Sequence, residues 1–316
     1  MKKILLVAGA LLALAACQRA PKVYTIQGGD ITITVTDFGA RVMSLTAPDR
    51  EGRLENIVVG HKTAKEYLHP AGERFLGACV GPVANRIGGA SFEVDGVRYS
   101  TPVNDNGHNT LHGGFNGVDN LFWDVLSVTD SSIRFHLVHP DGLEGYPGNL
   151  DITMTYSLSA ASEFCLSYEA TTDKPTVLNL THHSYWNLAG ESSGNVLGQE
   201  LQIFADQYMQ TTPGLIPTKN APVKGTGFDF TELRPIGAKA DLMKADKSLA
   251  AMDNWYDHNF VLRGENGKLK QAVKMRDPVS GRTMEIWTTE PCMQMYGAQN
   301  MDDKIPAKAA GKHLCQ

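Results

Sequence analysis

The chain has 316 residues, enough for one large domain or two ordinary ones. Hydrophobic residues make up 42% and charged residues 20%, a balance that excludes a disordered chain, a coiled coil and a collagen-like rod. Its 29 basic and 34 acidic residues give a net charge of -5, and no long run of lysine or arginine indicates a nucleic-acid partner.

The first sixteen residues have the pattern of an export signal. Lys2 and Lys3 are followed by an uninterrupted apolar run over residues 4–16. A membrane-spanning helix needs roughly 20 apolar residues, so this run is too short for a span and instead suits the core of a secretory signal. We therefore predict that residues 1–16 are removed on export.

The end of this signal resembles the cleavage site of bacterial lipoproteins, because Cys17 directly follows Leu-Ala-Ala. The resemblance implies cleavage before Cys17 and lipidation of that cysteine, which would anchor the chain to a membrane of the cell envelope. Gln18 stands where an aspartate would favour retention in the inner membrane, so we expect the outer membrane, facing the periplasm. The alternative is an ordinary secretory signal in which the cysteine occurs by chance.

Beyond the signal, the sequence has the pattern of β-strands almost throughout. Apolar and polar residues alternate with a period of two, and Thr, Val, Ile and Tyr are enriched. A stretch containing Pro and Gly between two of these segments predicts a hairpin. The predicted strands are 31–36, 132–138, 150–158, 164–171 and the hairpin of 271–275 with 283–288.

Helical patterns are scarce. Only residues 63–68 and 244–252 suggest short helices, and strands do not alternate with helices as in a parallel α/β fold. We therefore predict an all-β fold, a large antiparallel β-sandwich with long functional loops, in which residues 17–316 form one domain.

Four segments are dense in side chains that suit a sugar site. Planar polar groups can bond to adjacent sugar hydroxyls, and an aromatic face can cover the apolar face of a sugar ring. The candidate residues are Asn85 and Arg86 in 81–92, His108 and His112 in 104–125, His182 and His183 in 179–188, and Asp257 and His258 in 254–262.

Each of these signals also has a purely structural explanation. His108, His182 and His258 could be core histidines, and Arg86 could form a surface ion pair. Neighbouring residues of a strand point to opposite faces, so His182 and His183 cannot both face one site. The HExxH spacing of zinc enzymes is absent, and we predict no metal site.

The cysteines give no further functional signal. Cys79, Cys165, Cys292 and Cys315 lack the CxxC spacing of zinc or redox motifs. Disulfides are allowed in an export compartment, but the spacing does not say which cysteines would pair. Unpaired thiols are an equally good interpretation.

Taken in order, five motifs resemble the aldose 1-epimerase (galactose mutarotase) family. They are NRI-GG, LHGG, NLTHHSYWNLAG, DHNFVL and EPCMQMYGAQN, between about residues 23 and 301. The resemblance implies a large antiparallel β-sandwich. It also implies interconversion of the α and β anomers of free aldoses such as galactose and glucose, with no cofactor or metal.

The resemblance also assigns roles to residues. Ring opening needs a proton delivered to the ring oxygen and another removed from the anomeric hydroxyl, and histidine titrates in a range that suits the acid. By resemblance His183 is this acid, and His112 assists beside the ring oxygen. The residues implied to bind or line the sugar are Asn85, Arg86, Tyr185, Asp257, Gln294 and Tyr296. Sheet packing remains an alternative for both tyrosines.

The sequence departs from the family after residue 300. The family's base is a glutamate in a segment that follows the Tyr-Gly stretch, and here residues 301–316 contain no glutamate. The comparison predicts that the base and the last strands are missing. Glu290 is a weak candidate for a substitute, since its family counterpart is not the base.

Three accounts follow from this departure. The chain is a truncated product, or a variant that uses another carboxylate, or a lipoprotein that binds sugar without turning it over. The primary prediction remains an aldose 1-epimerase, and the alternative is a catalytically impaired sugar-binding lipoprotein or fragment.

Overall fold

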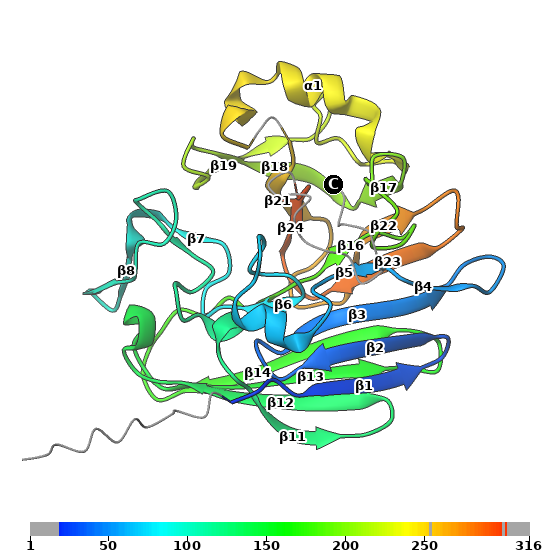
Figure 1. Ribbon diagram of the computed structural model, residues 1–316. Helices are drawn as coiled ribbons and strands as arrows, with labels where there is room; N and C mark the ends of the chain where they lie inside the picture. The colour runs from blue at the N-terminus through cyan, green and yellow to red at the C-terminus, as the bar shows by residue number, and fades with distance from the viewer. Residues whose placement is uncertain (1–18, 253–254, 299–300, 302–316) are drawn as a thin grey trace, which may run out of the picture.

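The computed structural model describes residues 19–252, 255–298 and 301 (Figure 1). Within these residues most of the regular structure is β-strand, joined by short 3-10 helices and a single α-helix. The helices are η1 (Ala64–Leu68), η2 (Gly88–Ala90), η3 (Val118–Asn120), η4 (Leu143–Gly145), η5 (Ile236–Lys239), α1 (Ala240–Ala245) and η6 (Lys247–Met252). No helix in this part of the chain is long and apolar enough to cross a bilayer.

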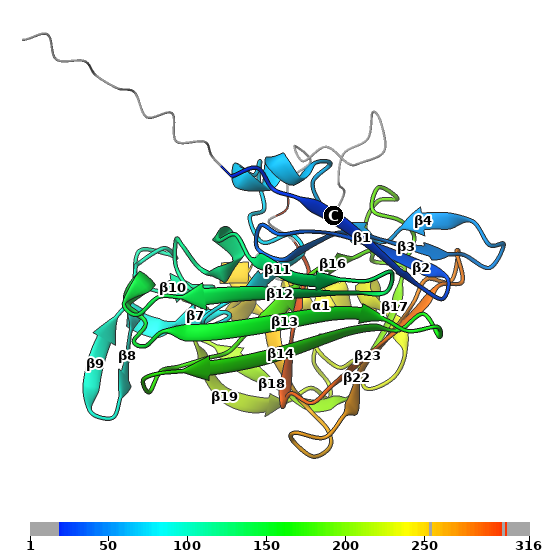
Figure 2. The same ribbon diagram turned by 90° about the horizontal axis from the view of Figure 1, so that it is seen from below.

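Two four-stranded antiparallel sheets pack against each other in the lower half of Figure 1. Figure 2 shows the second of them from below as a broad sheet. Alternate side chains of facing strands enter one hydrophobic core, among them Ile33, Phe135 and Ile152, which are fully buried. The first sheet contains β1 (Val23–Gly28), β2 (Ile31–Thr36), β3 (Arg41–Pro48) and β4 (Leu54–Asn56), and the second β11 (Asp124–Val128), β12 (Ser132–His139), β13 (Leu150–Leu158) and β14 (Phe164–Thr172).

Two further four-stranded sheets form the upper half, with α1 at the top of the view (Figure 1). Their buried residues, including Leu201 and Phe260, belong to the same hydrophobic core as the lower sheets. One sheet has the order β20 (Arg234–Pro235), β17 (Glu200–Ile203), β22 (Lys270–Arg276), β23 (Thr283–Thr288), and the other the order β19 (Pro217–Pro222), β18 (Ala205–Thr211), β21 (Asp257–Leu262), β24 (Cys292–Tyr296).

Short antiparallel ladders complete the described strands, and three of them carry candidate site residues. Arg86 lies on one, His183 on a second and Tyr185 on a third. The ladders are β7 (Arg86–Ile87) with β10 (Thr110–Leu111), β6 (Ala78–Val80) with β15 (Thr181–His183), β5 (Val58–Val59) with β16 (Tyr185–Trp186), and β8 (Ser91–Val94) with β9 (Val97–Ser100).

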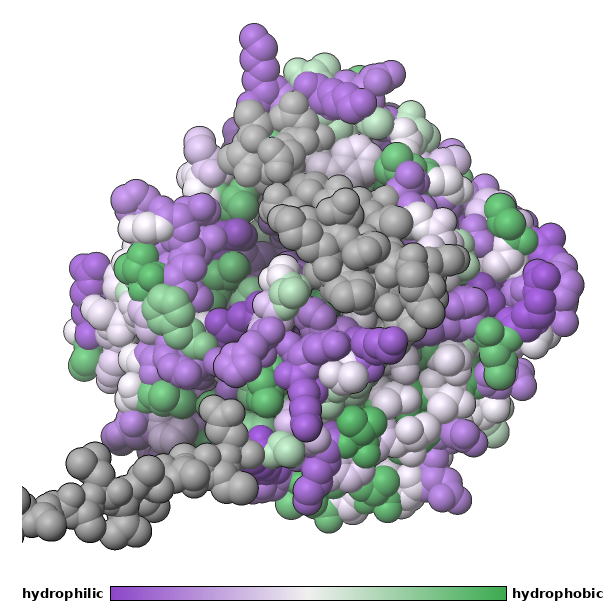
Figure 3. Space-filling view, viewed as in Figure 1, coloured by the Kyte–Doolittle hydropathy of each residue, from purple (hydrophilic) through white to green (hydrophobic). Residues whose placement is uncertain are grey.

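The predicted all-β sandwich is confirmed, and so are the predicted strands. The expected strands correspond to β2, β12, β13 and β14, and the expected hairpin to β22 and β23. In β2 the isoleucines are buried and the intervening threonines Thr32 and Thr34 are half-buried, as their alternation predicts. The face shown in Figure 3 is a mosaic of hydrophilic and hydrophobic residues.

The two predicted helices differ in detail from those observed. Residues 64–68 form a 3-10 helix, which begins after Thr63 with a capping box involving Glu66. The prediction over 244–252 merged two helices, because α1 ends at Ala245 and η6 begins at Lys247. Asp246 separates them. Its carboxylate accepts hydrogen bonds from the backbone N–H and the hydroxyl of Ser248, and so Asp246 caps the start of η6.

A buried ion network lies between β3 and the loop before β6. The carboxylate of Asp119 accepts hydrogen bonds from Arg74 at 2.8 and 2.9 Å, and it lies 3.6 Å from the guanidinium of Arg41. Arg41 also donates to the carbonyls of Arg74 and Leu76. The network therefore fixes the backbone on both sides of Phe75, a residue that contacts the candidate site.

Buried histidines should make the fold sensitive to acid. His139 on β12 is fully buried, neither ring nitrogen has a hydrogen-bond partner among the described residues, and burial lowers its pKa to about 4. The unfolded chain binds a proton on this histidine near pH 6.5, whereas the folded chain binds it only near pH 4. The free energy of unfolding therefore falls as the pH drops from about 6.5 towards 4. We expect His139 alone to cost about 2 kcal/mol of unfolding free energy between pH 7 and pH 5.

His139→Leu should remove this contribution while leaving stability at pH 7 nearly unchanged. The matched control is His136→Leu on the same strand, where the ring pairs with Asp151 at the surface. Urea unfolding at pH 7 and pH 5 measures both variants. An unchanged difference between the two pH values in His139→Leu would contradict the prediction.

Candidate active site

Histidine and amide groups meet where β7 begins and β10 ends. The backbone N–H of Asn85 donates to Nδ1 of His112 at 3.0 Å, and the backbone N–H of His112 donates to the carbonyl of Asn85 at 2.9 Å. Because Nδ1 accepts, the proton of the neutral ring lies on Nε2. Burial holds the pKa of His112 well below its usual range, with His183 and Arg86 acting in the same direction. His112 is therefore a neutral hydrogen-bond donor.

The glycine after His112 is required by a close backbone approach. Gly113 has φ +84°, and a Cβ there would lie 1.9 Å from the carbonyl oxygen of Gly81. The LHGG motif thus holds the His112 loop against the segment between β6 and β7 that leads to Asn85.

Gly113→Ala should destabilise the protein strongly and displace His112. Gly107→Ala is the matched control, because Gly107 also has positive φ but has open space around it. The control should cost about 1 kcal/mol, the strain of left-handed backbone alone. We expect Gly113→Ala to lower the free energy of unfolding, measured with urea, by several times as much. Equal losses in the two variants would contradict the requirement for glycine at position 113.

A row of aromatic rings runs from His112 through His183 and Tyr185 to Tyr296, and Phe75 lies beside the two histidines. The ring centroids of His112 and His183 lie 5.2 Å apart, nearly perpendicular. His183 lies 5.2 Å from Tyr185, and Tyr185 lies 5.9 Å from Tyr296. Phe75 packs against both histidines, at 4.6 Å from His112 and 5.8 Å from His183.

The two adjacent histidines of β15 face opposite sides, as predicted. His182 contacts the core: Nε2 lies 2.6 Å from the hydroxyl of Ser184 and Nδ1 lies 3.3 Å from that of Tyr156. Burial lowers the pKa of His182 to about 3. Burial also lowers the pKa of His183, while the carboxylates of Glu73 and Asp257 act in the opposite direction. Only His183 faces the aromatic cluster.

Charged and amide groups form the other half of the cluster. Arg86 Nε donates to Asp105 at 3.0 Å, and its Nη1 donates to the Asn85 side chain at 3.2 Å and lies 4.0 Å from Asp257. Gln294 donates to Asp257 at 2.8 Å across the β21–β24 ladder. Burial raises the pKa of Asp257, opposed by the Gln294 hydrogen bond and by Arg86.

The structure thus brings all eight predicted sugar-site residues into one continuous set of contacts. It leaves out other candidates: His108 is exposed, and His258 is a core residue packed on Phe228. Glu290 is exposed, and its backbone N–H bonds to the Thr288 side chain. The set consists of Asn85, Arg86, His112, His183, Tyr185, Asp257, Gln294 and Tyr296.

Sequence reasoning missed three residues around the site. Phe75 and Glu73 lie in a stretch without a dense polar pattern, and nothing in the sequence marks them. Asp105 was detectable, because it lies in the same polar segment as His112 and carries the charge that Arg86 needs. Its 3.0 Å contact with Arg86 orients that guanidinium.

Other expectations concern cysteines, metals and the chain ends. Cys79, Cys165 and Cys292 are free, and the described residues hold no group of His, Cys, Asp and Glu that could bind a metal ion. Cys17 and Cys315 lie outside the described residues. So does the segment 302–316, on which the expectation of a missing base rests.

Comparison with known proteins identifies two regions. The family model described as aldose 1-epimerase matches residues 22–314, and that of the prokaryotic membrane lipoprotein lipid attachment site matches residues 1–18. A galactose mutarotase from Sus scrofa is 37% identical over 289 residues, covering 90% of this chain and 80% of the relative. An aldose 1-epimerase from Escherichia coli is 33% identical, covering 84% and 75%.

Solved structures agree with this assignment. An aldose epimerase homologue from C. elegans superposes with a TM-score of 0.80 at 28% identity, covering 93% of this chain and 88% of that structure. A galactose 1-epimerase from Lactobacillus acidophilus superposes with a TM-score of 0.69 at 28% identity, covering 81% and 73%. The chain therefore belongs to the aldose 1-epimerase family, a family of isomerases, and carries a lipoprotein lipid attachment site at its N-terminus.

Proposed function

We propose that this chain interconverts the α and β anomers of free aldoses such as galactose and glucose by acid–base opening of the ring. The observation that supports this most is the unbroken set of contacts in which His112 and His183 lie beside Arg86 and Asp257. The printed name of the Sus scrofa relative, galactose mutarotase, points to the same substrate class.

The roles follow from the geometry and from the chemistry of a hemiacetal. His183 delivers the proton to the ring oxygen, and the Nε2–H of neutral His112 donates a hydrogen bond to the same oxygen. As the ring opens, solvent water takes the proton of the anomeric hydroxyl. The freed aldehyde then rotates, and reclosure, in which both protons move back, gives the other anomer. No metal or redox cofactor has a role in this sequence of steps.

The remaining residues hold the sugar. Asn85, Arg86 and Gln294 present planar donors and acceptors to its hydroxyls, and Asp257 accepts from them. Tyr185 and Tyr296 line the site with apolar ring surface.

A second candidate is aldose binding without turnover. Asp257 accepts a hydrogen bond from Gln294 at 2.8 Å and lies 4.0 Å from Arg86, and the alternative assigns this carboxylate to binding sugar hydroxyls. Under this alternative the site binds sugar but lacks a group that deprotonates the anomeric hydroxyl.

Polarimetry of freshly dissolved α-D-galactose and α-D-glucose separates the two candidates. Faster decay of the optical rotation with the unlipidated chain, in proportion to protein concentration, supports the mutarotase. Saturable calorimetric binding of galactose without acceleration supports the binding protein. Neither effect from a folded chain would overturn both.

We also propose that residues 17–316 form one domain behind a cleaved signal of residues 1–16. Cys17 then carries the lipid, and Gln18 directs the protein to the outer membrane on its periplasmic side. The match of residues 1–18 to the lipid attachment model supports the anchor. Density fractionation of envelopes should place the protein with outer-membrane markers, and Cys17→Ser should abolish its membrane association.

A further inference from the structure

The first described residue is fastened to the domain. Arg19 donates to the Asp37 carboxylate at 3.1 Å and to the carbonyl of Trp123 at 3.0 Å, and it lies 3.4 Å from Asp124. The side chain of Asp37 is fully buried and also accepts the backbone N–H of Lys22 at 2.8 Å. Two donors converging on a buried carboxylate hold this segment more firmly than an exposed ion pair would.

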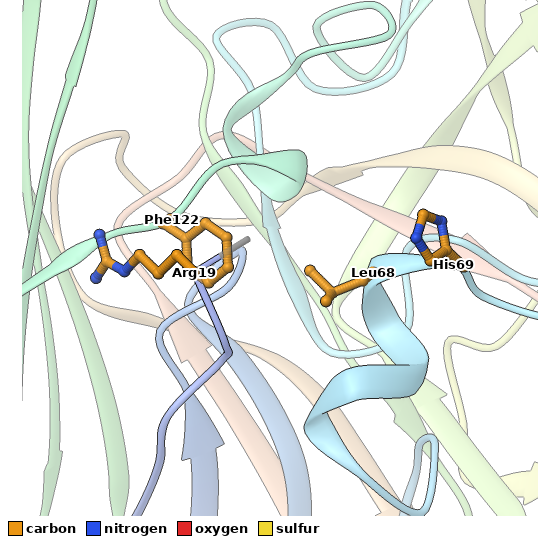
Figure 4. Close-up of a pocket in the computed structure, with 4 residues that line it drawn as sticks. All are labelled: Arg19, Leu68, His69 and Phe122. Carbon is orange, nitrogen blue, oxygen red and sulfur yellow. The ribbon is translucent and has the colours of Figure 1, made fainter. Parts of the chain in front are cut away.

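A small cavity of about 170 Å³ lies next to this contact, lined by Arg19, Leu68, His69 and Phe122 (Figure 4). The Arg19 guanidinium lies over the Phe122 ring, 4.8 Å from its centroid. Leu68 and Phe122 are half-buried and His69 is exposed, so the rim combines apolar and polar groups. Such a mixed rim suits the interfacial zone of a bilayer.

The attachment site at Cys17 is only two residues from Arg19. An extended chain advances at most about 3.6 Å per residue, so the backbone position that carries the lipid can be at most about 7 Å from that of Arg19. The headgroup zone of a bilayer is about 5–8 Å thick on each side. A lipid on Cys17 would therefore keep the cavity rim near the headgroups.

We propose that the face around Arg19, Leu68, His69 and Phe122 docks on the phospholipid headgroups of the membrane that holds the lipid anchor. Arg19, clamped between Asp37 and Phe122, prevents the domain from tumbling on its tether. The domain then keeps one fixed orientation on the membrane surface. This inference rests on lipidation at Cys17, which is part of the proposed function.

Fluorescence quenching in vesicles tests the docking. The lipidated chain is inserted into vesicles of phosphatidylethanolamine and phosphatidylglycerol that carry a nitroxide on some headgroups. A fluorescent non-canonical amino acid replaces His69 or, as a control, Leu269. Leu269 is 69% exposed and is the last residue of the β21–β22 loop, which lies at the bottom of Figure 2, whereas η1 lies at the top. We expect several-fold stronger quenching at position 69.

Arg19→Gln tests whether the contacts of Arg19 with Asp37 and Phe122 hold the domain in this orientation, with Arg263→Gln as the matched control. Both arginine side chains are 43% exposed and each pairs with an aspartate, Asp37 or Asp206. Arg19→Gln should bring the quenching at positions 69 and 269 close to each other, and Arg263→Gln should preserve the difference.

Flotation of the vesicles separates the possible failures. A chain that does not float overturns the lipid anchor and with it the docking. A chain that floats with equal quenching at positions 69 and 269 overturns the docking alone. Wild-type quenching in Arg19→Gln overturns the role of Arg19 in fixing the orientation of the domain.

Discussion

Replacing Asp119 by asparagine should lower the free energy of unfolding by about 3–5 kcal/mol, the usual cost of removing one partner from a buried ion pair. Asp119 is fully buried between Arg74 and Arg41, and the Arg41 side chain is only 1% exposed. Asparagine has nearly the same size but no charge, so a buried guanidinium would lose its nearest carboxylate. Urea denaturation followed by tryptophan fluorescence measures the change.

Asp206→Asn is the control for this prediction. Asp206 pairs with Arg263 at the surface, and pairs of this kind contribute about 0.2–1 kcal/mol. Similar losses of unfolding free energy in the two variants would contradict the prediction that the buried Asp119 network stabilises the fold more than a surface ion pair does. Asp119→Asn should also lower activity, because the network fixes the backbone on both sides of Phe75.

His183→Ala should reduce the catalysed rate of anomer interconversion by about 10²–10⁴-fold, the usual contribution of a positioned acid. The ring lies at the centre of the cluster, 5.2 Å from both His112 and Tyr185. Galactose binding should weaken much less, since the groups proposed to hold the hydroxyls remain. Polarimetry and calorimetry measure the two effects separately.

His136→Ala is the control, because His136 pairs with Asp151 at the surface of β12. It should retain the wild-type rate. A His183→Ala variant that folds and retains the wild-type rate would contradict the assignment of His183 as the acid.

The large sheets were predictable from sequence because their strands are long and half-buried. In β2 three apolar residues alternate with threonines, and the period of two indicates which face is buried. The ladders that carry the site are too short for such a pattern: β7, β10 and β16 have two residues each. Their positions depend on the surrounding sheets.

Ordered motifs predicted the eight candidate residues that the structure brings together, whereas the residues that support them were not predictable. Phe75 reaches both histidines because Arg74 is held by Asp119, 45 positions along the chain. The charge of Glu73 raises the pKa of His183 only because that same loop brings the carboxylate near the ring. No local pattern encodes an ion pair between such distant segments, so these contacts appear only in the folded structure.

Exchange spectroscopy by NMR tests the central claim most directly, because it measures anomer exchange of galactose at equilibrium. With the folded chain present, we expect exchange between the α and β anomeric protons to accelerate in proportion to protein concentration. The acceleration should be lost in His183→Ala and kept in His136→Ala. Exchange no faster than in buffer, with a chain that unfolds cooperatively and binds galactose, would contradict the claim that this site opens the sugar ring.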